Sequence, residues 1–270
     1  MKQLRRLIRR IEINLPNVLL IFLVNFENRI RKSGSHILFD GKRQMYLIKD
    51  KQYALYFPRK PRVLLYTHGL SARLNYLYEA YGLNKINLTQ VELFVDCGAN
   101  VGELSLIVKH RHDLRILAVE PEKKEFACLE KNIVGNNVNL VNGVLWKEDG
   151  IIQLHSKPNS GDSSVIISET GLPTFEVSSY RLDKLIMRLG FESLVSILKV
   201  EAEGAEPEVI DGAKEHLVYC KYVTFDGGAE RGIDKLTTFE VNGQILKKSN
   251  FEKIYSSATR DIELWKNLDY

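Results

Sequence analysis

The stretch Val91-Glu-Leu-Phe-Val-Asp96-Cys-Gly98-Ala-Asn100-Val-Gly102-Glu103 decides the fold of this chain. It begins with an apolar run that stops at Asp96, which is typical of a buried parallel strand. Gly98 and Gly102 follow, and glycine lets the backbone approach a ligand where a Cβ atom would clash. We therefore predict a strand, a tight loop shaped to hold a ligand, and a helix that begins near Gly102.

The middle residue of this loop narrows the choice of ligand. A dinucleotide fingerprint, G-x-G-x-x-G, lets a pyrophosphate sit against backbone N–H groups, whereas here Asn100 occupies the middle position. A second apolar run, from Arg115 to Val119, ends at Glu120. This carboxylate follows the glycine turn by about 20 residues, the separation at which an acid meets ribose hydroxyls. Two strands that end in carboxylates thus predict a nucleoside site that disfavours a pyrophosphate.

Strands and helices alternate from residue 91 onward, and this predicts an α/β fold with a mostly parallel sheet and helices on both faces. The predicted strands are 91–96, 115–119, 138–142, 194–198, 222–225, 251–255 and 262–266. The predicted helices are 102–110, 122–134, 182–190, 206–214 and 235–249. The pattern breaks at about 143–180, where short strands at 151–154, 163–167 and 175–178 predict a β-rich insertion over the active face.

Residues 1–88 are predicted to form an N-terminal α+β extension to a main domain at 89–270. Alternating side chains over 36–57 predict a small β-meander. The spacing of apolar residues then predicts a helix over 71–81, closed by Gly82.

The positive charge of the chain is concentrated at its start. Of the first 32 residues, eight are basic and only Glu12 and Glu27 are acidic. The basic ones are Lys2, Arg5, Arg6, Arg9, Arg10, Arg29, Arg31 and Lys32. The apolar run Val18 to Val24 lies between them and is too short to span a bilayer as a helix. Two interpretations stay open: a helix that docks on the core with a solvated basic edge, or a peripheral contact with the inner face of a membrane.

The remaining composition limits the compartment and the partners. The three cysteines, Cys97, Cys128 and Cys220, show no metal-ligand spacing and predict a reducing cytoplasm. Nucleic acid is not expected as a partner, because the basic residues gather at the start while the predicted sheet edge is acidic, which repels phosphate. The histidines form no ligand-spaced pair, and His155 in the insertion is the one histidine that we consider as a catalytic candidate.

Several motifs together resemble the FkbM-type methyltransferases, over roughly residues 89–230. The matching pieces are Asp96 to Gly102, Glu120-Pro121 followed by Phe126, Leu129 and Asn132, Gly161 to Ser164, Leu182-Asp183, and Leu198 to Glu206. The resemblance implies a class I methyltransferase (Rossmann-like) fold, S-adenosylmethionine as the cofactor, and methyl transfer to a hydroxyl oxygen. Glu201 departs from the family pattern, which usually has aspartate there. The segment from Asp226 to Gly232 resembles members associated with surface-polysaccharide synthesis, so the expected substrate is a small molecule or a glycan.

The predicted site lies beyond the carboxyl ends of the strands. The donor residues expected there are Asp96, Gly98, Asn100, Gly102, Glu120, Pro121 and Asn142. Catalytic roles are expected for Glu201, Asp226 and Asp162, with Glu201 the first choice as general base. Substrate contacts are expected from Ser163, Ser164, Glu203, Glu230 and Arg231. A Mg²⁺ ion shared by Glu201 and Asp226 is an alternative to the base.

Two further expectations concern charged residues near the site. Lys199 interrupts an apolar run and should pair with a neighbouring acid, because a buried unpaired ammonium costs several kcal/mol. Glu203 and Glu206 have a second interpretation, as solvated acids that complement a helix N-terminus.

Two other functions share part of this pattern. A nicotinamide-dependent oxidoreductase or epimerase acting on a sugar would have the same fold and the ribose carboxylate, but it predicts a third glycine and a Tyr-x-x-x-Lys pair that are not evident. A non-enzymatic protein would use the basic N-terminus to bind a membrane or nucleic acid.

Overall fold

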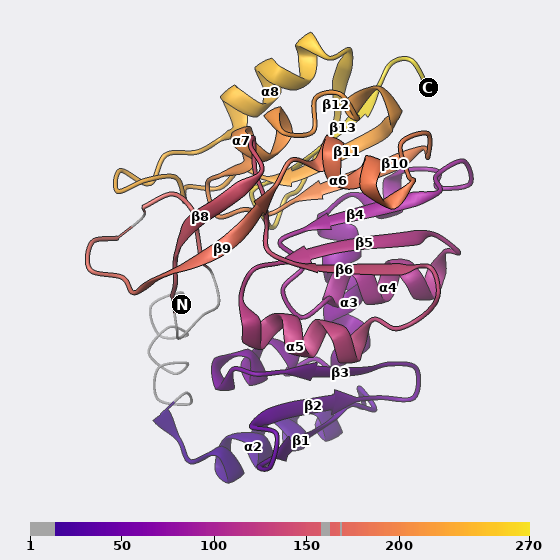
Figure 1. Ribbon diagram of the computed structural model, residues 1–270. Helices are drawn as coiled ribbons and strands as arrows, with labels where there is room; N and C mark the ends of the chain where they lie inside the picture. Colours follow the sequence, from indigo (N-terminus) through magenta and orange to yellow (C-terminus); the bar gives the residue numbers. More distant parts are fainter. Residues whose placement is uncertain (1–13, 158–162, 168) are drawn as a thin grey trace.

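The computed structural model describes residues 14–157, 163–167 and 169–270. Its central feature is a seven-stranded sheet in the order β12-β13-β11-β10-β4-β5-β6 (Figure 1). The strands are β4 (Leu93–Cys97), β5 (Arg115–Glu120), β6 (Val138–Asn142), β10 (Ser196–Val200), β11 (Cys220–Asp226), β12 (Phe251–Ser256) and β13 (Ile262–Asn267). All neighbours pair in parallel except β13, which is antiparallel to both β11 and β12. The mostly parallel sheet is confirmed.

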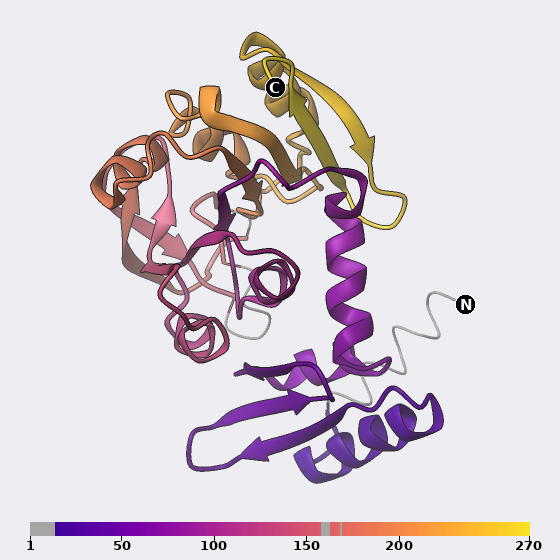
Figure 2. The same ribbon diagram turned by 90° about the vertical axis from the view of Figure 1, so that its right-hand side faces the viewer.

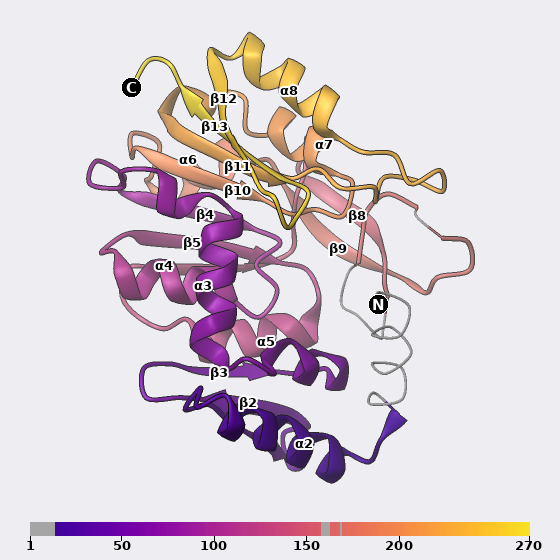
Figure 3. The ribbon, with the colours of Figure 1, turned by 180° about the vertical axis from the view of Figure 1, so that it is seen from behind.

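Helices cover both faces of this sheet, which confirms the class I methyltransferase (Rossmann-like) architecture. On one face lie α3 (Leu70–Ala80), α4 (Glu103–Arg111) and α5 (Lys123–Asn132), which share one apolar core; α3 is seen in front of the sheet in Figure 3. On the other face lie α6 (Leu182–Leu189), α7 (Glu206–Asp211) and α8 (Phe239–Lys248). Successive strand residues alternate between the two cores: Phe94 packs in the first, and Leu93 and Val95 pack in the second.

Strand β10 differs from the prediction in a way that matters for the site. The apolar run predicted a strand at 194–198, but the strand runs from Ser196 to Val200 and includes Lys199. Lys199 lies opposite Asp96 of β4 in the parallel register, and both side chains are buried. A charged residue can occupy a central strand here because its partner is supplied by the neighbouring strand.

The N-terminal part forms the predicted meander and packs against the main sheet. The meander consists of β1 (His36–Asp40), β2 (Met45–Lys49) and β3 (Ala54–Phe57), preceded by α2 (Asn17–Ile30) and followed by η1 (Lys60–Tyr66) and η2 (Leu83–Lys85). Helix α3 runs from the meander to the main sheet (Figure 2). Asn132 of α5 ties the two parts together, since its amide donates to the Tyr56 carbonyl and accepts from the Tyr56 N–H. One apolar core is continuous through both parts.

The insertion forms a separate three-stranded sheet in the order β7-β9-β8. Its strands are β7 (Val144–Leu145), β8 (Gly150–His155) and β9 (Thr174–Tyr180). The strand predicted at 163–167 is wrong, because this segment makes only an isolated bridge between Ser164 and His155. Its serine side chains bond to other elements instead of continuing a ladder.

Two predicted helices are shorter than expected. The helix predicted at 206–214 ends at Asp211, and Gly212 then packs directly on the carbonyl of Trp146. The helix predicted at 235–249 begins only at Phe239, because Lys235 has a left-handed backbone with φ of 53°. Between α7 and β11 lies η3 (Leu217–Tyr219). Among the described residues, no helix has the length and apolar character required to cross a bilayer.

Candidate active site

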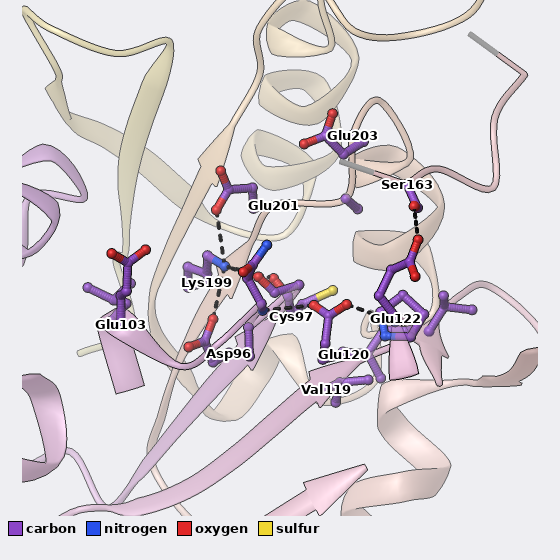
Figure 4. Close-up of a pocket in the computed structure, with 18 of the residues that line it drawn as sticks. Asp96, Cys97, Glu103, Val119, Glu120, Glu122, Ser163, Lys199, Glu201 and Glu203 are labelled. Carbon is purple, nitrogen blue, oxygen red and sulfur yellow. Dashed lines mark hydrogen bonds and ion pairs between the residues drawn. The ribbon is translucent and has the colours of Figure 1, made fainter. Parts of the chain in front are cut away.

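A cavity of about 260 Å³ lies at the carboxyl ends of β4, β5 and β10, where the predicted site was expected (Figure 4). Eight of the predicted site residues line it: Asp96, Gly98, Asn100, Glu120, Pro121, Ser163, Glu201 and Glu203. Six do not appear in its wall: Gly102, Asn142, Ser164, Asp226, Glu230 and Arg231. Asp162 lies outside the described residues.

The glycine turn holds three strands together at the cavity floor. The N–H groups of Gly98 and Ala99 both donate to the Val119 carbonyl of β5, each at 3.0 Å. Gly98 has φ of +71°, and a Cβ atom added there would stand 1.9 Å from the Glu201 carbonyl oxygen that follows β10. Only glycine permits both this conformation and this approach. Gly102 instead starts α4 with φ of +84° and packs on Leu129.

Glu120 ends β5 and is held by backbone donors. Its two carboxylate oxygens accept from the N–H of Asn100 at 2.7 Å and from that of Glu122 at 2.9 Å. The residue is 4% exposed, and burial raises its pKa to about 8 although both hydrogen bonds favour the charged form. Asn142 stands behind this strand end, where its amide donates to the carbonyls of Glu120 and Pro121. It supports the end of β5 without lining the cavity.

Asp96 and Lys199 form a buried ion pair under the glycine turn. The Lys199 ammonium lies 2.9 Å from one Asp96 oxygen and donates to the carbonyls of Cys97 and Gly98. Ser105 donates to the second Asp96 oxygen at 2.6 Å. Burial opposes the ammonium charge, but Asp96 and Glu201 outweigh it and raise the pKa of Lys199. The prediction that Lys199 pairs with an acid is confirmed.

Glu201 is surrounded by cations. Its carboxylate accepts from the Arg260 guanidinium at 2.7 Å and from the Tyr81 hydroxyl at 2.6 Å, and lies 3.4 Å from the Lys199 ammonium. Burial opposes ionisation, but the charges of Lys199 and Arg260 outweigh it and hold the pKa of Glu201 at about 2. A general base is most effective with a pKa near the working pH. This environment therefore suits a fixed negative charge better than a base.

Arg260 occupies the position that the sequence had assigned to a metal. The same guanidinium nitrogen that bonds Glu201 also bonds Asp226, at 2.8 Å. Burial raises the pKa of Asp226, and so does the charge of Glu201. Within the described residues no group of three or more His, Cys, Asp or Glu side chains is placed to hold a metal ion. The two carboxylates thus share an arginine, and they do not fit the predicted Mg²⁺ site.

The segment that contains Ser163 and Ser164 connects the two ends of the cavity. Ser163 donates to the carboxylate of Glu122, which precedes α5, and Ser164 donates to the carbonyl of Glu203 at 2.8 Å. Figure 4 shows Ser163 directed at Glu122, with Glu203 nearby on the loop after β10. His155 makes the backbone bridge to Ser164. The insertion thus closes over the cavity, as the prediction of an insertion over the active face required.

The loop after β10 is fixed by buried polar contacts. Glu206 accepts from the N–H groups of Ala202 and Gly204 and from the Thr238 hydroxyl, and it is 1% exposed. Its interpretation as a solvated acid is therefore wrong. Arg231 pairs with Glu208 at 2.6 Å and donates to the Gly204 carbonyl, so its guanidinium supports this loop from outside the cavity.

One side of the cavity could not be predicted from the sequence. It comes from the N-terminal part, from the start of α4 and from the turn between β12 and β13, and its residues are Arg62, Arg73, Tyr81, Glu103 and Arg260. Glu103 accepts from Arg62 at 2.5 Å, from Arg73 at 3.1 Å and from the Tyr66 hydroxyl at 2.9 Å. Glu103 ends the glycine-turn stretch from which the fold was predicted, whereas the other four residues belong to no recognisable motif.

The chain is similar to several known proteins. A curated protein of Beauveria bassiana (strain ARSEF 2860), named Methyltransferase 1, is 27% identical over 143 residues, which cover 44% of this chain and 57% of that protein. The chain thus matches little more than half the length of this relative. Among solved structures, M. jannaschii TYW2 in complex with AdoMet has a TM-score of 0.42 at 11% identity, with 86% of this chain and 90% of that one covered. The precorrin-6y C5,15-methyltransferase of Geobacter metallireducens has a TM-score of 0.39 at 15% identity, covering 70% and 88%.

These structural scores are low, and the fold assignment rests on the sheet order described above. The family profile described as Methyltransferase FkbM domain matches residues 96–260, from the first carboxylate of the cavity to its last arginine. This match covers more than half of the sequence, and the chain therefore belongs to the FkbM methyltransferase family.

Proposed function

We propose that the protein is an S-adenosylmethionine-dependent methyltransferase that acts on a hydroxyl oxygen, on a sugar or glycan intermediate of surface-polysaccharide synthesis. The observation that carries this proposal is the cavity where Glu120, at the end of β5, faces the glycine turn that follows β4. Membership of the FkbM family supports methyl transfer and leaves no support for the nicotinamide-dependent alternative.

The donor would occupy the part of the cavity near Glu120. The carboxylate at this strand end suits ribose hydroxyls, which would donate to it. Val144, Leu145 and Leu154 of the insertion give this part of the wall an apolar surface suited to an aromatic base. The donor supplies a methyl group that is already activated by its sulfonium. The protein therefore has to orient the two reactants and exclude water, and positioning contributes most of the rate.

The acceptor would lie towards the loop after β10. Glu201 was the expected base, but its bonds to Arg260, Lys199 and Tyr81 give it a low pKa. We assign it, with Asp226, a positioning role that keeps this wall rigid and polar. Glu203 lines the cavity two residues further along the same loop, in a left-handed conformation with φ of 52°. Such a conformation in a residue other than glycine is favoured where it aims a functional side chain. Glu203 is the carboxylate that we place beside the acceptor hydroxyl.

A hydroxyl-rich acceptor is supported by the polar character of this wall. Arg62, Arg73 and Glu103 form an ion-paired surface that offers both donors and acceptors of hydrogen bonds. The assignment to surface polysaccharides rests on the resemblance of the segment from Asp226 to Gly232.

Binding and product analysis test the two parts of the proposal separately. Isothermal titration of the protein with S-adenosylmethionine, S-adenosylhomocysteine and NAD should show binding of the first two and none of the third. Mass spectrometry of glycans from cells with and without the protein should then show one sugar that gains a single methyl group. Failure of the titration would remove the methyltransferase assignment. Donor binding with unchanged glycans would remove the acceptor assignment alone.

Two amide variants separate the roles of the acids at the acceptor end. Glu203→Gln should lower kcat with little change in donor affinity, because it removes the group beside the acceptor. Glu201→Gln should weaken the wall and lower stability. A larger loss of kcat in Glu201→Gln, with a pH–rate profile that loses its acidic limb, would instead assign the base to Glu201.

A further inference from the structure

Helix α2 (Asn17–Ile30) is apolar on two sides. On its inner side Leu20 and Val24 are buried, at 1% and 3% exposure. On its outer side six apolar residues are exposed, by 38% to 82%: Val18, Leu19, Phe22, Leu23, Phe26 and Ile30. We call these six residues the outer face of α2. A helix that packs on a core normally turns polar residues outward, and a contiguous apolar patch of this kind marks a surface that another body covers.

The outer face is held in a fixed orientation. The Asn25 side chain donates to the Ile37 carbonyl at 2.9 Å and accepts from the Ile37 N–H at 2.7 Å, so it caps the edge of β1. The Tyr46 hydroxyl donates to Asn17 at 2.9 Å. These contacts come from the start and from the middle of the helix. These contacts therefore fix the helix so that Phe22 and Phe26 point outward. The two rings stack with their centroids 6.3 Å apart.

Positive charge lies at the C-terminal end of this face. Arg29, Arg31 and Lys32 are exposed at the end of the helix. The first 32 residues carry eight basic and two acidic residues, a net charge of +6, while the whole chain has +4. The rest of the chain therefore has 30 basic and 32 acidic residues, a net charge of −2. Within the described residues, the apolar face and the three basic residues Arg29, Arg31 and Lys32 thus lie at the same helix, and together they complement an anionic surface.

We propose that the outer face of α2 docks on an anionic lipid bilayer, with its apolar side chains below the headgroups and the adjacent basic residues among them. An interfacial helix needs only this combination of an apolar face and flanking cations. A second copy of the chain fits less well, because a stable dimer buries about 800 Å² on each partner. A helix of 14 residues, about 21 Å long and about 10 Å wide, offers less.

Sedimentation with lipid vesicles tests this docking on the full chain. The protein should bind vesicles that contain phosphatidylglycerol at least about tenfold more strongly than vesicles of phosphatidylcholine alone, and salt should weaken this binding. Phe22→Glu/Phe26→Glu should lower the binding at least about tenfold. Arg29→Glu/Arg31→Glu/Lys32→Glu should abolish the preference for anionic lipid. Met187→Glu, which alters an apolar residue of α6 that is 65% exposed, is the matched control and should bind like the wild type.

Three outcomes would overturn the proposal. In the first, the wild-type chain does not bind anionic vesicles. In the second, the chain self-associates in sedimentation velocity and the double phenylalanine variant abolishes this, which would make the face an interface between copies. In the third, vesicle binding appears only after removal of residues 1–13, which would show that this segment covers the face. Thermal unfolding of each variant at the wild-type midpoint excludes a folding defect.

Discussion

The two ends of the cavity hold the same functional group in opposite ways. At one end Glu120 receives hydrogen bonds from two backbone N–H groups, is buried, and has its pKa raised to about 8. At the other end Glu201 is bonded to Arg260 and lies beside Lys199, and its pKa is about 2. A carboxylate with a raised pKa can still respond to a ligand. A carboxylate enclosed by cations is a structural charge, because its protonation would leave those cations unpaired.

Gly98 contacts both ends of the cavity, since its N–H donates to the Val119 carbonyl beside Glu120 and its Cα lies against the Glu201 carbonyl. Its substitution should therefore disturb both ends. Gly98→Ala would place a Cβ atom 1.9 Å from the Glu201 carbonyl, a backbone atom that cannot move aside. We expect a loss of at least about 3 kcal/mol in the free energy of unfolding, and no donor binding. Urea unfolding and calorimetry with S-adenosylhomocysteine measure these effects. Gly190→Ala is the control, because Gly190 has a similar φ of +69° with nothing within 4 Å, and it should cost only about 1 kcal/mol. Equal losses in the two variants would contradict the role of the close approach.

Glu120→Gln should separate the ends by weakening the donor end alone. The amide keeps one acceptor oxygen but loses the charge that we expect the ribose hydroxyls to use. The dissociation constant of S-adenosylhomocysteine should rise between about tenfold and about 100-fold, while the free energy of unfolding changes by less than about 1 kcal/mol. Unchanged affinity in a folded variant would show that the ribose lies elsewhere.

Arg260→Met should lower the stability of the protein and leave donor affinity nearly unchanged, the opposite of Glu120→Gln. Without the guanidinium, Glu201 and Asp226 lose the cation that they share, and the pKa of Glu201 should rise. We expect a loss of about 2 kcal/mol in the free energy of unfolding at pH 7 and a donor affinity within about threefold of the wild type. In the wild type, the stabilisation from Glu201 is present above its unfolded pKa, near 4.5, and is lost as the pH falls towards 2.

The control for Arg260→Met comes from the same hairpin. Lys253→Met removes a cation of β12 that pairs with Glu263 at 2.8 Å, away from the cavity. The Lys253 side chain is 46% exposed, and Glu263 keeps the hydrogen bond from the Trp265 indole N–H when the lysine is removed, so the loss should be below about 1 kcal/mol. A loss of donor affinity in Arg260→Met as large as that in Glu120→Gln would mean that the two ends are not independent.

The pH dependence of donor binding should show the smallest effect. We expect ribose hydroxyls to bind the ionised form of Glu120, so donor binding should lower the pKa of this group and release a proton. Affinity should therefore rise roughly threefold to tenfold from about pH 6.5 to about pH 8.5, and level off above the pKa near 8. Calorimetry with S-adenosylhomocysteine in buffers of different ionisation enthalpy measures both quantities. Glu120→Gln is the reference, because the ligand's own titration is the same with both proteins. A pH dependence of equal size in this variant would assign the effect to a group other than Glu120.

The glycine-turn end of the cavity could be predicted from the sequence because its residues are close in the chain. A strand, a glycine turn and the next strand bring Asp96, Gly98, Asn100 and Glu120 to one sheet edge by local rules alone, since parallel neighbours end on the same side. The apolar runs also identified all seven strands of the main sheet. The errors fell where a distant contact overrides the local pattern, as at Lys199, which extends β10 because Asp96 pairs with it.

The sequence by itself determined the fold class, the family and the glycine-turn side of the cavity, because these depend on short-range spacing. Only the tertiary structure decided what surrounds Glu201. Tyr81 comes from 120 positions earlier and Arg260 from 59 positions later, and no periodicity relates such residues. Tertiary packing likewise decided which side of α2 is buried. Because this helix is apolar on both sides, its sequence pattern does not predict which side packs on the core. Secondary structure follows from short-range patterns in the sequence, whereas the environment of a charged side chain depends on residues that are distant in the sequence.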